Sequence, residues 1–66
     1  MNKIEFLGVV ESFLIEKNMS ATTFGILANK EPNLVFTLRE GRVCREETRA
    51  RVLDFINNYQ EEKSND

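Results

Sequence analysis

Apolar residues recur at helical spacing along the first quarter of the chain. Between Lys3 and Lys17 they occupy an arc of roughly 240° on a helical wheel, and the rest of the wheel is polar. These residues are Ile4, Phe6, Leu7, Val9, Val10, Phe13, Leu14 and Ile15. The pattern predicts one amphipathic helix from Lys3 to Lys17. Because the arc is wider than a single contact requires, two interpretations stay open: a helix clamped in a small core, or one whose edge also contacts a second subunit.

Two shorter helices are predicted in the middle of the chain. Ser20 is a candidate N-cap for a helix that ends near Ala28, because its hydroxyl can accept hydrogen bonds from the free N–H groups of the first turn. Pro32 has no N–H to donate and belongs in the first turn of a helix from about Pro32 to Glu40. Gly41 is suited to the left-handed conformation that ends a helix.

The last apolar stripe lies in the C-terminal third of the chain. Its members at helical spacing are Val52, Leu53, Phe55, Ile56 and Tyr59. We expect this helix to begin near Arg45 or Glu46 and to fade after Tyr59. Residues 60–66 are polar, which indicates a flexible tail. The whole pattern predicts an all-α domain over residues 1–59, a compact bundle of four short helices.

Composition argues against several functional classes. The chain has 66 residues, which is enough for one small domain. It contains no histidine and one cysteine, Cys44, so Cys-His and Ser-His pairs are excluded and zinc would be poorly bound. We therefore expect no enzyme activity, no metal site and no cofactor. The default interpretation of Cys44 is burial as a small hydrophobic residue, and redox sensing is the alternative.

The hydropathy of the chain gives no sign of a membrane span or of a signal peptide. No stretch reaches the roughly 18 apolar residues that a span needs, and charged residues interrupt the first fifteen positions at Lys3, Glu5 and Glu11. We expect no membrane partner and a cytoplasmic location.

Four positions have the spacing of a helix-turn-helix motif, in which two short helices cross steeply through a tight turn. Gly25 is the small residue where the helices cross, and Asn29, four residues later, tolerates the positive φ of the turn. Val35 and Leu38, ten and thirteen residues after the glycine, hold the second helix against the first. Other helical hairpins with an asparagine turn show a similar pattern, and Lys30 stands where an apolar residue is usual.

The segment from Ser20 to Ile56, SATTFGILANKEPNLVFTLREGRVCREETRARVLDFI, resembles the small phage Cro/repressor-like (XRE-type) helix-turn-helix proteins of bacteria. The family signature is Ser-x-Thr-x-Phe-Gly, then Pro-Asn-Phe-Val-x-x-Leu-Arg-x-Gly-Arg, then Arg-Val-Leu-x-Phe-Ile, and this chain has Leu34 at the phenylalanine position. Cys44 and Glu46 depart from it, since proline and leucine are expected there. The resemblance implies a lambda-repressor-like fold that contains a helix-turn-helix and binds DNA.

The resemblance also implies roles for individual residues. Base edges would be contacted from the start of the third helix by Pro32, Asn33, Phe36 and Thr37. Phosphates would be contacted by the start of the second helix and by basic residues that flank the third, namely Thr22, Thr23, Lys30, Arg39, Arg42 and Arg45. Each role has a structural alternative. Phe36 could belong to the core, Arg39 could pair with a carboxylate on its own helix, and the two threonines could only cap.

The charge distribution bears on how such a protein would bind. The net charge is −2, whereas most DNA-binding domains are basic, but residues 29–51 carry six basic and four acidic side chains. Carboxylates near phosphates oppose the counterion release that supplies most DNA affinity, so one copy should bind weakly. We therefore expect a homodimer on palindromic DNA with half-sites about one turn apart. The candidate dimer-interface residues are Phe6, Val9, Phe13, Val52, Phe55 and Tyr59.

Two functional hypotheses follow. The first is a sequence-specific regulator of transcription that binds double-stranded DNA, acts by occupying an operator, and is associated with the bacterial nucleoid when bound. The second is a helix-turn-helix fold used as a protein-binding module, an antiactivator or anti-repressor with little DNA affinity. The acidic balance of the chain and the presence of Phe36 on the third helix favour the second.

Overall fold

The computed structural model describes residues 2–59, which form four α-helices. These are α1 (Lys3–Lys17), α2 (Ala21–Asn29), α3 (Leu34–Arg39) and α4 (Glu46–Asn58). No strand occurs in this part of the chain, so the predicted all-α class and the compact four-helix arrangement are confirmed. None of the described helices is long and apolar enough to cross a membrane. The predicted tail, residues 60–66, lies outside the described residues.

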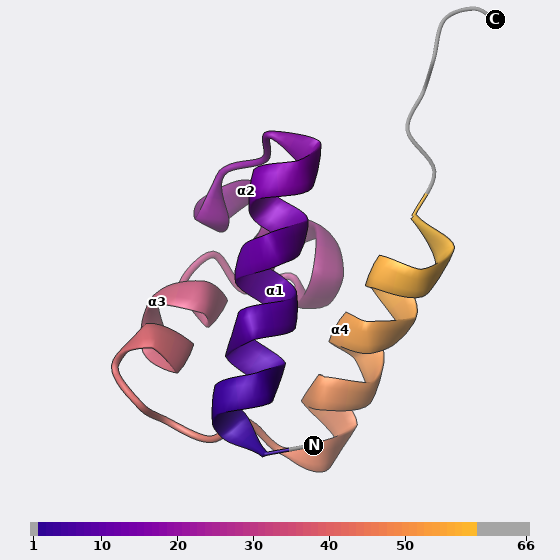
Figure 1. The fold of residues 1–66 in the computed structure, drawn as a ribbon. Coiled ribbons are helices and arrows are strands. Elements are labelled where there is room, and N and C mark those ends of the chain that lie inside the picture. The colour runs from indigo at the N-terminus through magenta and orange to yellow at the C-terminus, as the bar shows by residue number, and fades with distance from the viewer. Residues whose placement is uncertain (1, 60–66) are drawn as a thin grey trace, which may run out of the picture.

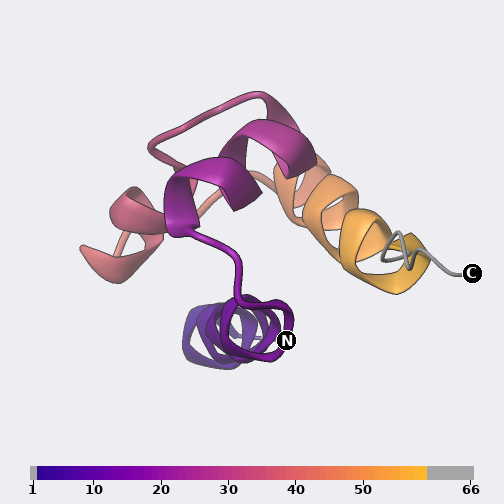
Figure 2. The same cartoon turned by 90° about the horizontal axis from the view of Figure 1, so that it is seen from above.

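The other three helices form an arch over α1. Figure 2 looks along α1 and shows α3 and α4 on either side of the arch, with α2 connecting them at the top. Figure 1 shows that α1 and α4 run in the same direction. The closest packing is of α2 against both α3 and α4, and of α1 against α3. The hairpin of α2 and α3 is therefore held from two sides.

Hydrogen bonds at both ends fix the limits of α1. The Asn2 side chain accepts from the Glu5 N–H (2.8 Å), and the Glu5 carboxylate accepts from the Asn2 N–H (3.3 Å), which together form a capping box. At the other end Asn18 has φ of 53°, and the Met19 N–H donates to the Leu14 carbonyl (2.9 Å). The helix therefore spans Lys3–Lys17, as the sequence predicts.

Both limits of α2 agree with the prediction to within one residue, but the left-handed residue that follows does not. The Ser20 hydroxyl accepts from the Thr23 N–H at 3.1 Å, so Ser20 is the N-cap. The left-handed residue is Lys30, with φ of 53°, and the prediction that Asn29 would take this conformation is wrong. Asn29 stays helical because the next two N–H groups fold back, from Lys30 to the Ile26 carbonyl (2.9 Å) and from Glu31 to the Gly25 carbonyl (3.0 Å).

The third helix begins two residues later than predicted. Pro32 and Asn33 form a turn in which the Leu34 N–H donates to the Glu31 carbonyl at 3.1 Å, so α3 starts at Leu34. Gly41 has φ of 97°, which confirms the predicted left-handed stop. The fourth helix begins at Glu46, within the predicted limits, and ends before Tyr59, which is extended.

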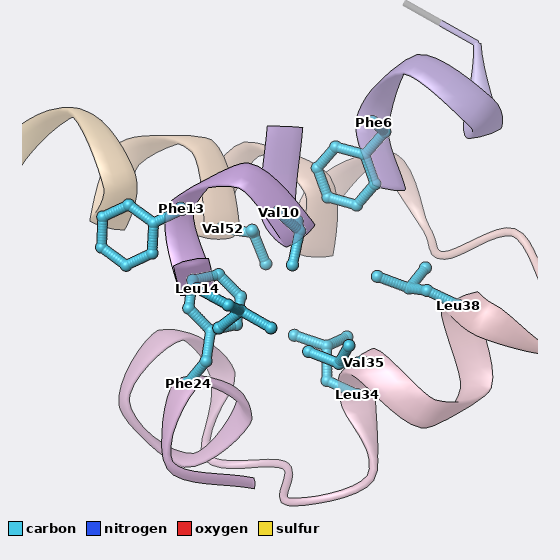
Figure 3. Packing of buried hydrophobic residues seen from close by; sticks show 9 residues of the cluster. All are labelled: Phe6, Val10, Phe13, Leu14, Phe24, Leu34, Val35, Leu38 and Val52. Carbon is cyan, nitrogen blue, oxygen red and sulfur yellow. The ribbon is translucent and has the colours of Figure 1, made fainter. Parts of the chain in front are cut away.

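The hydrophobic core draws on all four helices (Figure 3). Its buried members are Phe6, Val10, Phe13, Leu14, Phe24, Leu34, Val35, Leu38 and Val52. Part of the core is aromatic, since Phe13 lies 5.5 Å from Phe24 and 5.3 Å from Tyr59, measured between ring centroids. Phe55 joins the same group at 5.5 Å from Phe24, also between centroids. We call Phe13, Phe24, Phe55 and Tyr59 the aromatic cluster, and its tilted rings connect α1, α2 and α4.

Candidate functional site

One side of α3 is fixed to the core and the other side is open. Leu34, Val35 and Leu38 are buried, with at most 6% of each exposed to solvent. On the open side, Asn33 is exposed and Phe36 retains 43% of its accessible surface. Phe36 is therefore not part of the core, and the alternative that placed it there is wrong. The predicted base-contacting residues Pro32 and Asn33 are both at the surface, at the entrance to this helix.

A close backbone approach sets how α2 meets α3. A Cβ atom added to Gly25 would lie far inside van der Waals distance of the Glu31 carbonyl oxygen and 3.3 Å from the Leu34 Cβ atom. Only glycine fits here without movement of the turn. Phe24 is buried and Ala28 is half-buried on the same helix, on the side that packs against the core. The structure therefore agrees with the predicted need for a small residue at position 25.

Side chains tie the turn between α2 and α3 to α4. The Asn29 Nδ2 donates to the Glu31 Oε1 at 3.0 Å, and the Asn29 Oδ1 accepts from the Arg51 guanidinium at 3.2 Å. Arg51 also approaches Glu47 one turn earlier, at 4.0 Å. Asn29 thus contributes its side chain to the turn, where the sequence predicted a backbone role. No sequence pattern pairs Arg51 with Asn29, because they are 22 residues apart.

Arg39 is engaged by a carboxylate of α1. Its Nε and Nη2 atoms donate to the two carboxylate oxygens of Glu11 at 2.7 Å and 2.9 Å, which is a bidentate pair. The alternative that Arg39 pairs within its own helix is therefore wrong. These hydrogen bonds hold the pKa of Glu11 below its usual value and raise the pKa of Arg39. The guanidinium also lies over the Phe36 ring, 5.6 Å from its centroid.

The remaining predicted contact residues differ in their exposure and in the hydrogen bonds that they already make. The Thr37 hydroxyl donates to the Leu34 carbonyl at 2.8 Å, and its side chain is half-buried. Thr22 and Thr23 are exposed at the start of α2, and the Ser20 hydroxyl donates to the Thr23 hydroxyl at 2.9 Å. Thr23 therefore takes part in the N-cap of α2, as the structural alternative predicts. Thr22 is exposed next to it.

All four predicted phosphate-contacting cations, including Arg39, are exposed. The other three are Lys30, Arg42 and Arg45, and Arg42 approaches the Glu40 carboxylate at 3.8 Å. Two of them border a cleft of about 380 Å³ between the end of α3 and the start of α4. Its lining residues are Glu31, Leu34, Thr37, Leu38, Arg42, Val43, Cys44, Arg45 and Thr48. Cys44 is half-buried there and packs against the core, which agrees with its interpretation as a small hydrophobic residue.

The predicted dimer-interface residues are mostly inside the domain. Phe6, Phe13 and Val52 are core residues, each at most 5% exposed, and Phe55 and Tyr59 are half-buried in the aromatic cluster. Phe6, Phe13 and Val52 cannot contact a second copy while the core is intact, and Phe55 and Tyr59 expose only part of their surface. The core explains only part of the wide apolar arc of the first helix, because Ile4 and Ile15 are exposed. Of the six candidates, only Val9 lies outside both the core and the aromatic cluster. Val9 lines a groove between α1 and α4.

Within residues 2–59 no group of three or more histidine, cysteine, aspartate and glutamate side chains is placed to hold a metal ion. Comparisons of the chain with protein-family models, with curated proteins and with solved structures find no significant match. The resemblance to XRE-type proteins therefore stays a prediction from the residues that carry it.

Proposed function

We propose that the chain is a sequence-specific regulator of transcription that binds double-stranded DNA and acts by occupying an operator. The observation that carries this proposal is the two-sided character of α3. Three buried side chains hold it rigidly, while Asn33 and Phe36 are presented to solvent. A rigid, protruding helix of this kind is what a helix-turn-helix protein inserts into the major groove.

The exposed side chains at α3 suit both kinds of DNA contact. The Asn33 amide can donate and accept toward an adenine, and the Phe36 ring can contact a thymine methyl group. Lys30, Arg42 and Arg45 are the exposed cations that would contact phosphates. In this proposal Arg39 does not contact a phosphate. Its guanidinium is hydrogen-bonded to Glu11 and packs on the Phe36 ring.

Two copies on one operator would increase the affinity of this weakly charged domain. Five of the six residues first considered for a protein–protein dimer lie in the core or in the aromatic cluster. The proposal therefore places separate copies on half-sites about one turn of DNA apart, without those contacts.

A titration on fragments of genomic DNA, repeated at two salt concentrations, tests this function. We expect binding at low salt that weakens steeply as salt rises, because several phosphate contacts release counterions. Asn33→Ala should cost about 1–3 kcal/mol on the preferred site only, whereas Arg42→Ala should weaken all sites and lower the salt slope by about one. Asn57→Ala, an exposed change on α4, is the matched control. Absence of binding at low salt, or a slope no steeper than one phosphate contact gives, contradicts the proposal.

A second candidate is a protein-binding module, such as an antiactivator, which exposed apolar residues on the hairpin favour. Ile26 and Leu27 of α2 are 46% and 53% exposed, and Phe36 of α3 is also exposed. Pull-down of a defined protein by material that ignores DNA would support this candidate if Phe36→Ala abolishes the capture. Loss of the partner in Arg39→Ala and Arg42→Ala, with Phe36→Ala unaffected, would count against it.

A further inference from the structure

A groove of about 600 Å³ lies between α1 and α4, on the side of α1 away from Arg39 and its partner Glu11. It is lined by Glu5, Gly8, Val9, Ser12, Phe13 and Glu16 of α1 and by Ile56 of α4. Below the groove, the Phe13 ring holds the two helices together through Phe55 and Tyr59, at 5.9 Å and 5.3 Å between centroids. The groove is therefore a surface feature above a packed core.

No side chain fills the groove at its middle. Gly8 is exposed, and a Cβ atom added there would meet nothing within 4 Å. Glycine in a helix interior is less favourable than alanine, so Gly8 reduces the stability of α1. Next to Gly8 on the outer side of α1, Ile4 and Ile15 are 75% and 81% exposed, and they extend the apolar surface beyond the groove.

Both charged residues that line the groove are acidic. Glu5 and Glu16 are exposed and stand eleven residues apart, which is about three helical turns and about 16 Å along one side of α1. They therefore mark the two ends of the groove with negative charge.

This charge pattern decides between possible occupants. If a second copy paired its own groove face with this one, acidic residues would meet acidic residues whether the two α1 helices ran parallel or antiparallel. Residues 60–66 contain three acidic side chains and one lysine, so they carry the same sign of charge as the groove. A positively charged partner is the complementary one.

We propose that this groove binds an amphipathic helix of another protein. Apolar side chains of the partner would lie over Gly8 and fill the groove, and two lysine or arginine residues about eleven positions apart would pair with Glu5 and Glu16. This inference does not rest on the proposed DNA contacts, because none of Asn33, Phe36 and Arg42 lines the groove. One chain can therefore carry DNA on α3 and a protein on α1 and α4.

A pair of synthetic peptides tests the charge and the spacing. Each is a capped helical peptide of about 16 residues with leucines on one side, and two lysines about eleven positions apart in one peptide are replaced by two glutamates in the other. Titrated into the full ¹⁵N-labelled chain, the lysine peptide should shift the amide signals of Gly8, Ser12 and Ile56. It should bind about tenfold more tightly than the glutamate peptide.

Two variants test the location. At Gly8 an added Cβ atom meets nothing within 4 Å, so Gly8→Leu places a side chain in the groove. It should weaken the lysine peptide about tenfold or more, with unchanged helical circular dichroism. Glu16→Lys should reduce the preference for the lysine peptide by about tenfold. Leu27→Ala, which changes an exposed apolar residue on α2, is the control and should bind like the original chain.

Five outcomes would overturn the inference. The first three are that the two peptides bind equally, that the signal changes fall on α3, and that Gly8→Leu binds unchanged. The fourth is that sedimentation shows a dimer of the free chain that Gly8→Leu dissociates. The fifth is that nuclear Overhauser contacts place residues 60–66 in the groove, and either of these last two assigns the groove to this chain itself. DNA titration of Gly8→Leu separates this result from the proposed function, since DNA affinity should stay the same.

Discussion

Two helical glycines show how differently the two sides of this domain are packed. Gly25 of α2 is buried against the Glu31 carbonyl and the Leu34 side chain, and no larger residue fits. Gly8 of α1 is exposed and has open space around the position of a Cβ atom. The first glycine lets two helices approach closely, whereas the second keeps a groove open. The same residue type thus allows close packing in the hairpin of α2 and α3 and leaves a groove between α1 and α4.

The difference has a thermodynamic counterpart. Glycine lowers helix stability at both positions relative to alanine, but at Gly25 this loss is offset by close packing of the hairpin on the core. At Gly8 the described part of the chain contains no contact that offsets it. Substitution by alanine should therefore lower the free energy of unfolding at Gly25 and raise it at Gly8.

The largest effect is expected where the two sides are joined. Phe13→Ala removes the ring that contacts Phe24, Phe55 and Tyr59, so it should reduce the free energy of unfolding by about 3–5 kcal/mol. Because a domain of this size is stable by only about 3–10 kcal/mol, much of the population should unfold. Urea titration followed by circular dichroism measures this. Phe36→Ala, the same change at an exposed ring, is the control and should cost less than about 1 kcal/mol.

Gly25→Ala should have the next largest effect. The new methyl group clashes with the Glu31 carbonyl, so the turn must shift, and we expect a loss of about 1–3 kcal/mol in the free energy of unfolding. The same urea titration gives the value. Stability equal to that of the original chain would show that the hairpin is looser than the structure describes.

Gly8→Ala should change stability in the opposite direction. The methyl group enters open space, and alanine is the better helix former, so we expect a gain of about 0.5–1 kcal/mol. Comparison of the midpoints of thermal unfolding for this variant and Gly25→Ala tests the contrast directly. A loss of stability in both variants would mean that α1 is packed at Gly8 after all.

The smallest effect concerns the pair of Glu11 and Arg39, and it depends on pH. The pKa of Glu11 in the folded chain lies below its usual value of 4.5, so the pair stabilises the fold above that pH. This stabilisation is lost as the pH falls through the lowered pKa, where Glu11 takes up a proton. Thermal unfolding of Glu11→Gln and of the original chain should therefore differ near neutral pH and converge in acid. Curves that stay parallel throughout the acid range would contradict this role.

The sequence predicted the parts of the fold that depend on neighbouring residues. The N-cap at Ser20, the left-handed Gly41 and the limits of α1 are local, since each depends on hydrogen bonds between residues a few positions apart. The left-handed residue at the end of α2 was placed one position early. That position depends on which carbonyls of α2 accept the last N–H groups, and residue preference for positive φ does not decide this.

Long-range contacts account for the rest of the differences. The pairing of Arg39 with Glu11 spans 28 residues, and nothing near Arg39 in the sequence indicates α1 as its partner. The width of the apolar arc in α1 could not separate surfaces that face the core, such as Phe6 and Phe13, from an exposed position such as Ile15. The groove was missed for the same reason, because a hydropathy pattern does not reveal where two neighbouring helices leave a groove between them.

The contacts around Phe36 affect how it would meet any ligand. Its ring is exposed but lies under the Arg39 guanidinium, which two hydrogen bonds anchor to α1. Side chains that are already held in one rotamer lose little conformational entropy on association. The contact with Arg39 favours one orientation of Phe36, so a ligand of α3 would meet a ring that is partly ordered through a carboxylate on a different helix.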